Sequence, residues 1–261
     1  MTKTVNYLSI GVDELRNLAK KDDRTAMFHL ARYHLDGYDR VKIDREVAAR
    51  MAWDLAQKGD ALGSSLSFLI ERPARNENAT ARLRQSTALR ADLVKLAEAG
   101  NMFAQNFLGS IISCDIEDER AASHLPSHRQ RYDWMTRESE AAQYHRKAAA
   151  QGNPVAFYNL AIRFVVGRGA AEHPELAIEN LTLAAKAGLA RAQYLLGFAY
   201  QKGEGVPEDT AKANEWFQRA AKQGHKAAAL ECLDAKPSTG GPELPAEAAQ
   251  DHPLALVVAP R

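Results

Sequence analysis

The chain has 261 residues, of which 46% are apolar and 26% are charged, and its formal net charge is +1. This is the composition of a soluble protein with enough apolar residues for a core, and two cysteines exclude a disulfide framework. The N-terminal residues lack a sustained apolar segment, and no run approaches the length of a membrane span. We therefore expect a cytoplasmic protein without a signal peptide and without membrane contact.

The predicted elements begin with a helix over residues 12–21, followed by a helical hairpin over residues 24–59. Residues 61–70 and 86–100 have the apolar periodicity of two more helices. The charged stretch between them, residues 71–84, is predicted to be a loop or a fraying helix start. The first half of the chain therefore resembles a series of helical hairpins.

Glycines at regular intervals mark the predicted ends of the second helix of each hairpin. They are Gly59, Gly100, Gly152, Gly188 and Gly224, with spacings of 41, 52, 36 and 36 residues. Because the last two spacings are equal, the spacing of 52 contains an insertion of 16 residues, within about 114–139. Insertions in repeat arrays usually form loops on one face, often the binding face. The segment is charged and contains Pro126, and its composition fits a second binding element or a spacer equally well.

Two copies of one pattern, residues 156–188 and 192–224, lie 36 positions apart. Each copy predicts two helices joined by a glycine elbow, and a fixed period of this size indicates a stacked repeat array. Asp209 is the expected N-cap of one second helix, and Pro174 falls in the first turn of the other. We predict a repeat domain over residues 1–235 and a disordered tail over 236–261, whose apolar segment LALVV docks on the array, frays or forms a recognition motif.

The second copy, AQYLLGFAYQKGEGVPEDTAKANEWFQRAAKQG, resembles the Sel1-like repeat family, which is related to tetratricopeptide repeats. The first copy departs from the family pattern at Ala161, Ala170 and Asn180. The resemblance implies an all-α fold, a right-handed α-α superhelical solenoid of about five hairpins. It also implies a scaffold or adaptor that binds another protein through a concave groove.

Counting from Leu196 and Gly197, the resemblance places a set of groove positions on the first helix of each hairpin. The candidate partner-binding residues are Phe28, Arg32, Phe103, Asn106, Tyr158, Ile162, Arg191, Tyr194, Phe198 and Gln201. Aromatic residues and arginine are common in protein-binding hot spots, and such a groove suits an extended or helical peptide. The alternative for each aromatic or aliphatic member is packing between neighbouring helices.

The sequence contains no recognisable catalytic motif, and we expect no cofactor, no metal and no small-molecule substrate. Cys114, His124 and His128 fit no familiar zinc spacing. Acidic residues interrupt the arginines at 72, 75, 82, 84 and 90, so a nucleic-acid partner is a weaker alternative.

An enzyme is the other alternative, because some cysteine-rich Sel1-like relatives have been described as binding or hydrolysing β-lactams. This chain lacks their cysteines, and Ser64, Ser65 and Ser67 are not in a Ser-x-x-Lys setting. The sequence therefore favours a non-enzymatic adaptor whose partner is another protein or a peptide.

Overall fold

The computed structural model describes residues 10–38, 41–71, 79–123, 126–169 and 173–234. Within these ranges the regular structure is entirely helical. The twelve helices are α1 (Val12–Ala19), α2 (Arg24–Asp36), α3 (Arg45–Gln57), α4 (Ala61–Glu71), α5 (Ala79–Glu98), α6 (Met102–Ala122), α7 (His128–Ala150), α8 (Pro154–Val166), α9 (Pro174–Lys186), α10 (Ala190–Lys202), α11 (Thr210–Lys222) and α12 (Lys226–Asp234). The predicted tail lies outside the described residues.

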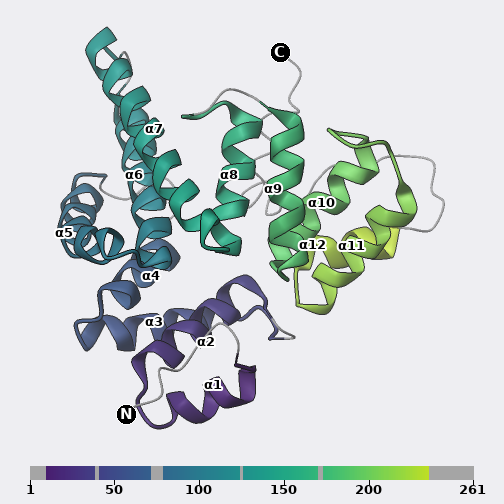
Figure 1. Cartoon of the computed structure of the whole chain (residues 1–261), viewed down its shortest axis with the longest axis horizontal. Helices are drawn as coiled ribbons and strands as arrows, with labels where there is room; N and C mark the ends of the chain where they lie inside the picture. The colour runs from purple at the N-terminus through teal and green to yellow at the C-terminus, as the bar shows by residue number, and fades with distance from the viewer. Residues whose placement is uncertain (1–9, 39–40, 72–78, 124–125, 170–172, 235–261) are drawn as a thin grey trace.

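Consecutive helices pack as antiparallel hairpins, and this confirms the predicted all-α fold. The five hairpins are α2 with α3, α4 with α5, α6 with α7, α8 with α9, and α10 with α11. Helix α1 packs on α2, and α12 packs on α11. The hairpins follow an arc that brings the loop after α2 beside the last hairpins (Figure 1).

Side-chain caps explain where several helices begin. The Asp209 carboxylate accepts the backbone N–H of Lys212 at 2.9 Å, which confirms the predicted N-cap of α11. Asp23 and Asp44 cap α2 and α3 in the same way, and Pro174 occupies the first turn of α9 as predicted. Capping satisfies backbone donors that a helix leaves without internal acceptors.

The five regularly spaced glycines have the left-handed conformation that their predicted role requires. Their φ angles are 72° (Gly59), 89° (Gly100), 83° (Gly152), 98° (Gly188) and 88° (Gly224). Asp22, which stands in the equivalent place after α1, also has a positive φ, 62°. A residue in this conformation reverses the chain after each second helix, so the next first helix can begin at once.

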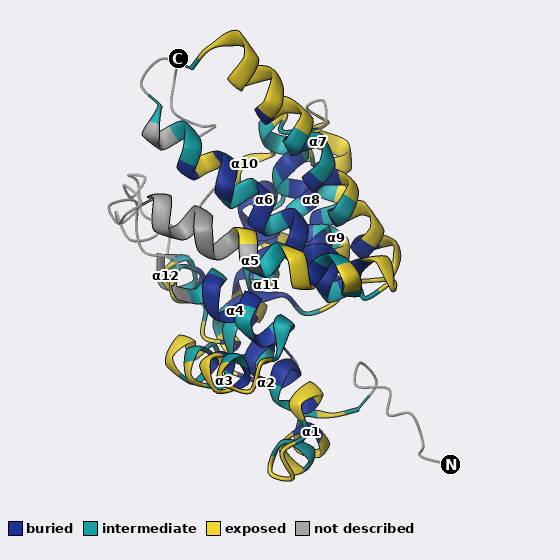
Figure 2. Ribbon diagram, turned by 90° about the vertical axis from the view of Figure 1, so that its left-hand side faces the viewer, coloured by how far each residue is buried: buried dark blue, intermediate teal, exposed yellow. Residues whose placement is uncertain are grey.

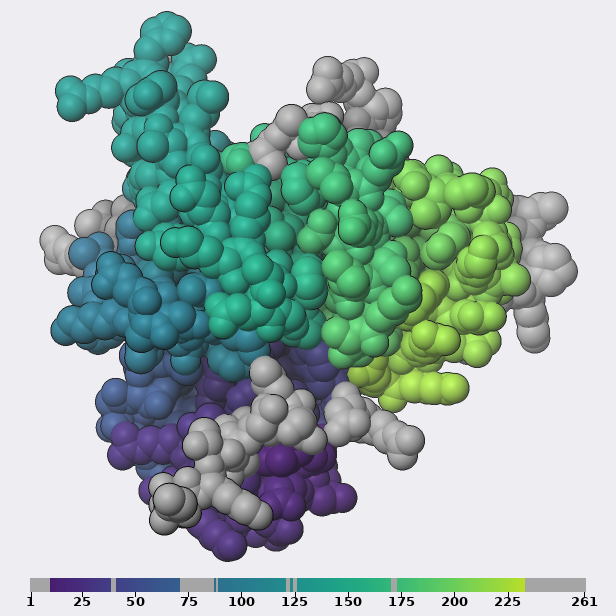
Figure 3. Space-filling view, viewed as in Figure 1, coloured from purple at the N-terminus to yellow at the C-terminus, as the bar shows by residue number. Residues whose placement is uncertain are grey.

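The insertion does not form the expected loop; instead, it lengthens two helices. Helix α6 continues to Ala122, and α7 begins at His128, capped by Ser127 in a capping box with Gln130. Ile116 and Trp134 are buried in a small core between the extended ends, which explains why the added residues stay helical. We call this end of the hairpin, residues 114–139, the projection. It stands clear of the molecule's body as the teal feature in Figure 3.

Helix α5 also begins earlier than the helix predicted over 86–100. It starts at Ala79, so the fraying start predicted between 71 and 84 is partly helical. Residues 72–78 lie outside the described part of the chain.

Candidate interaction surface

The first helices α6, α8 and α10 present matching positions, because they are equivalent parts of the repeat. Positions i, i+7 and i+10, counted from Phe103, Val155 and Arg191, lie on one face of each helix. All of them except Phe198 are partly exposed. We call the eight partly exposed side chains the inner-face stripe: Phe103, Ser110, Ser113, Val155, Ile162, Val165, Arg191 and Gln201.

The ten predicted groove residues divide between this stripe and the core. Phe103, Ile162, Arg191 and Gln201 belong to the stripe. The remaining six are buried, so the prediction that they are exposed is wrong for Phe28, Arg32, Asn106, Tyr158, Tyr194 and Phe198. Figure 2 shows the dark blue of buried residues along α6, α8 and α10.

Four of the six stand at the i+3 position of a first helix, which points between helices rather than outward. Arg32 and Phe198 stand at i+7: Arg32 lies over the Phe103 ring, and Phe198 belongs to the core of the last hairpins. Tyr194 stacks on His225 with 4.7 Å between ring centroids and contacts Phe217 at 5.8 Å. Phe28 meets the Phe103 ring edge-to-face at 5.2 Å. The Tyr194 and Phe28 rings therefore pack against side chains inside the protein and are unavailable to a partner.

The first hairpin also contacts the last hairpins directly, an arrangement that the sequence did not indicate. The Arg191 Nη2 atom donates to Asp36 Oδ1 at 2.6 Å, and the Arg191 guanidinium lies 5.1 Å from the centre of the Tyr158 ring. The backbone N–H of Ile43 donates to the Gln223 carbonyl at 2.9 Å. We call these interactions, together with the buried Tyr38 side chain, the closing contact.

Tyr38 belongs to the apolar core of the last hairpins, although it follows α2 in sequence. Its hydroxyl is buried without a hydrogen-bond partner among the described residues, and burial raises the pKa of this hydroxyl far above its usual range. Gly37 permits the close approach: a Cβ there would lie 3.1 Å from the Cβ of Ala190. The closing contact therefore covers part of the face that the sequence predicted to be open.

Amide side chains connect α6 to α8 beside the stripe. The Asn159 amide donates to Asn106 Oδ1 at 3.0 Å and to Ser110 Oγ at 3.3 Å. His145 Nδ1 lies 3.1 Å from the same Asn106 oxygen, and burial together with the charge of Arg163 lowers the pKa of His145 well below its usual value. The buried amides are occupied by contacts inside the protein.

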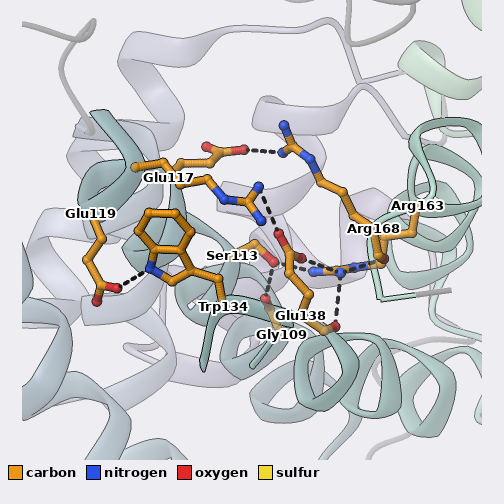
Figure 4. A network of polar contacts seen from close by, with 9 residues as sticks. Gly109, Ser113, Glu117, Glu119, Trp134, Glu138, Arg163 and Arg168 are labelled. Atoms are coloured by element: carbon orange, nitrogen blue, oxygen red, sulfur yellow. Dashed lines mark hydrogen bonds and ion pairs between the residues drawn. The ribbon is translucent and has the colours of Figure 1, made fainter. Parts of the chain in front are cut away.

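A buried ion pair lies where α6, α7 and α8 meet (Figure 4). Arg163 Nη1 donates to Glu138 Oε2 at 2.8 Å, and the same guanidinium donates to Ser113 and to the Arg168 carbonyl. Burial lowers the pKa of Arg163, and Glu138 opposes that shift. Arg168 in turn donates to Glu117 at 3.0 Å. This network fixes the base of the projection to the next hairpin.

A pocket of about 540 Å³ lies on the projection and is open to solvent. Its walls are Arg120, Pro126, Arg131, Trp134 and Met135. The sequence did not predict this pocket, because a charged segment with a central proline is not typical of paired helices. The tryptophan was the one available signal.

The described residues do not assemble a recognisable reaction centre. No group of three or more His, Cys, Asp and Glu side chains among them is arranged to hold a metal ion, and His124 lies outside the described ranges. The hydroxyls of Ser64 and Ser65 donate to the carbonyls of Asp60 and Ala61 at the start of α4. None of the helices in the described part of the chain is both long and apolar enough to cross a membrane.

The alternative of a nucleic-acid partner rests on the arginines at 72, 75, 82, 84 and 90. The structure describes the side chain of one of them, Arg90. Arg90 lies 3.6 Å from the buried carboxylate of Asp115. The side chains at 72, 75, 82 and 84 are outside the described residues.

Helical hairpins that follow one another along the chain and are joined by left-handed glycines define a helical repeat protein. Comparison with protein families identifies the repeats: the Sel1 repeat matches residues 24–52, 135–153, 154–189 and 190–225. The chain is a Sel1 repeat protein, related to the tetratricopeptide repeat family, as its sequence indicated. The unmatched part of the described chain includes α4, α5 and the outer part of the projection.

Two curated fungal proteins show local similarity. Chitin synthase regulatory factor 3 of Schizosaccharomyces pombe is 54% identical over 41 residues, which are 16% of this chain and 4% of that protein. Chitin synthase regulator SKT5 of Saccharomyces cerevisiae is 32% identical over 92 residues, which are 34% of this chain and 13% of that protein. The chain thus spans only a small part of the length of each regulator.

Solved structures of bacterial repeat proteins also match. A Sel1 repeat protein from Oxalobacter formigenes is 33% identical, with a TM-score of 0.43, and the match covers 55% of this chain and 96% of that one. A putative Sel1 repeat protein from Klebsiella pneumoniae subsp. pneumoniae is 18% identical, with a TM-score of 0.45, over 87% of this chain and all of the other.

Proposed function

We propose that this protein is a non-enzymatic regulatory adaptor that holds another protein against the inner-face stripe. The observation that carries the proposal is the repetition of partly exposed positions on α6, α8 and α10. Their side chains are an aromatic ring, aliphatic groups, hydroxyls, an amide and a guanidinium. Such a surface offers apolar contact area with polar groups among it, as protein interfaces do. The polar side chains also make hydrogen bonds within the protein, which hold them in place.

The names of the fungal relatives support a regulatory role, since both are regulators of chitin synthase. The similarity covers a small part of those proteins, so the shared element is the repeat. A shared repeat does not carry over the relatives' partner to this chain. We propose a protein or peptide partner, with no small-molecule substrate and no nucleic acid.

The proposal is tested by affinity capture from the native cell extract with three versions of the chain. One is unaltered, one carries Ile162→Glu and Val165→Glu on the stripe, and the control carries Leu176→Glu and Leu183→Glu. The control changes exposed leucines of α9, the second helix of the same hairpin. Circular dichroism and thermal melting establish that all three versions fold alike.

We expect a partner that the unaltered chain and the control retain and that the stripe variant loses. A partner retained equally by all three would contradict binding at the stripe. Failure of the unaltered chain to retain any specific protein would contradict the adaptor function itself.

A further inference from the structure

Charge is segregated along the projection in a way that leaves its outer end cationic. Residues 120–132 contain three arginines and no Asp or Glu. The nearest carboxylates serve contacts inside the projection: Glu119 accepts from Arg137 at 2.8 Å and from Trp134 Nε1 at 2.8 Å. Asp133 also pairs with Arg137, at 3.4 Å. The outer end therefore presents a positive surface whose neighbouring acids are already occupied.

Large apolar side chains accompany these charges. Tyr132 is 74% exposed and Met135 is 69% exposed, and these are the two highest values among the exposed large apolar residues of the described chain. Met135 borders the pocket that Pro126 and the buried Trp134 also line. Exposed apolar side chains grouped around a pocket mark interaction sites more often than isolated ones do.

The pocket wall is held in place by the projection's own contacts. The Arg120 guanidinium lies 5.5 Å from the centre of the Trp134 ring, and Trp134 is fixed on its other side by the hydrogen bond to Glu119. Arg131 Nε donates to the Pro126 carbonyl at 3.3 Å, which holds its guanidinium at the rim. A rigid aromatic anchor with arginines around it loses little side-chain freedom on binding.

We propose that the outer end of the projection is a second docking site, which takes an acidic segment of a partner protein that carries a bulky apolar side chain. The apolar side chain enters the pocket beside Trp134 and Met135, and a carboxylate pairs with Arg131 at the rim. Arg120 already lies 3.5 Å from the buried carboxylate of Glu138 and serves as the pocket wall. Tryptophan, tyrosine, methionine and arginine are the residue types enriched at protein interfaces. Nucleic acid and anionic membranes would require a broader positive footprint than three arginines provide.

The test is a selection of random displayed peptides on the full chain, followed by affinity measurements with the enriched peptides. Three versions of the chain are compared: the unaltered chain, a variant with Arg131→Glu and Met135→Asp, and a control with Arg219→Glu and Leu176→Asp. Both pairs change one exposed arginine and one exposed apolar residue. Circular dichroism checks that the folds are equal.

We expect enriched peptides that combine Asp or Glu with Trp, Phe, Leu or Met. They should bind the projection variant at least about tenfold more weakly and the control unchanged, as expected for the loss of hot-spot contacts. Peptides without acidic residues, or equal binding to all three versions, would overturn the proposal. It would also be overturned if a single-stranded oligonucleotide or phosphatidylserine vesicles bound more tightly than the peptides and lost that binding in the projection variant.

Discussion

Asp36 and Arg191 are 155 positions apart in the sequence, yet the guanidinium of Arg191 donates to the carboxylate of Asp36 at 2.6 Å. Asp36 is the last residue of the first helix of the first hairpin, and Arg191 lies in the first turn of the first helix of the fifth. The pair therefore ties the two ends of the arc together. It also means that the inner-face stripe lies beside a contact made by the chain itself, with Arg191 belonging to both.

Replacement of Asp36 by alanine should weaken the closing contact. The Asp36 side chain is 3% exposed and that of Arg191 is 38% exposed, so the unpaired guanidinium regains only part of its hydration. We expect a loss of about 1–3 kcal/mol in the free energy of unfolding. Hydrogen exchange should also become faster at the amide of Ile43, which bonds to Gln223.

Asp13→Ala is the control, because Asp13 pairs with Arg16 on the exposed surface of α1. Its effect on the free energy of unfolding should stay below about 1 kcal/mol. Unchanged exchange at Ile43 in the Asp36 variant would show that the pair does not hold the ends of the arc together.

The ion pair between Arg163 and Glu138 predicts unequal effects of single and double replacements. Glu138→Ala leaves a buried guanidinium without its carboxylate and should lower the free energy of unfolding by about 3–5 kcal/mol. The double variant Glu138→Leu with Arg163→Met removes both charges and should recover much of that loss. Chemical denaturation measures the free energy of unfolding of the single and double variants. A loss in the double variant equal to the sum of the two single losses would argue against charge burial as the cause.

Gly197 predicts a steric effect that follows from the closeness of α10 and α11. A Cβ at this position would lie 2.7 Å from the ring of Phe217, which is almost fully buried and has no room to move. Gly197→Ala should therefore reduce the free energy of unfolding by about 1–3 kcal/mol. Gly11→Ala serves as the control, because an added Cβ there meets no atom within 4 Å; similar losses in both variants would point away from the Phe217 contact.

His29 predicts a loss of stability in acid. Burial, with a further contribution from the charge of Arg32, lowers the pKa of His29 to about 4, from 6.5, while Asp23 acts in the opposite direction. Below about pH 6.5 the unfolded chain gains a proton that the folded protein excludes. The free energy of unfolding should therefore fall as the pH falls, by about 2 kcal/mol for this group between about pH 7 and about pH 5.

His29→Gln should flatten the dependence of the unfolding free energy on pH in that interval. His128→Gln, at an exposed position of α7, is the matched control for the replacement of a histidine by glutamine. Denaturant titrations at the two pH values measure this dependence. An equal change in the free energy of unfolding in the His29 variant and in the unaltered protein would refute the prediction.

Local patterns made much of the fold predictable. The left-handed glycines, the Asp209 cap and the hairpins 156–188 and 192–224 follow from features that lie within a few residues of one another. The helical projection was not predicted, because its stability depends on Ile116 and Trp134 meeting across two helices.

The candidate site was predictable only in part. Repeat equivalence identified positions that recur on α6, α8 and α10, but an angular difference between neighbouring positions of a helix decides whether a side chain is buried. Tyr158 and Tyr194 therefore lie in the core, whereas Ile162, one turn beyond Tyr158, reaches solvent. The contact of Asp36 and Tyr38 with the last hairpins depends on the curvature of the whole arc, which no local pattern encodes.

The most direct test of the adaptor function is site-specific photo-crosslinking in cells of the native organism. A photo-reactive amino acid replaces Ile162 on the inner-face stripe in one version of the chain and Leu183 on α9 in the other. We predict that a specific protein becomes crosslinked at position 162 and not at position 183. Crosslinking of the same protein at both positions, or only at position 183, would contradict binding at the inner face.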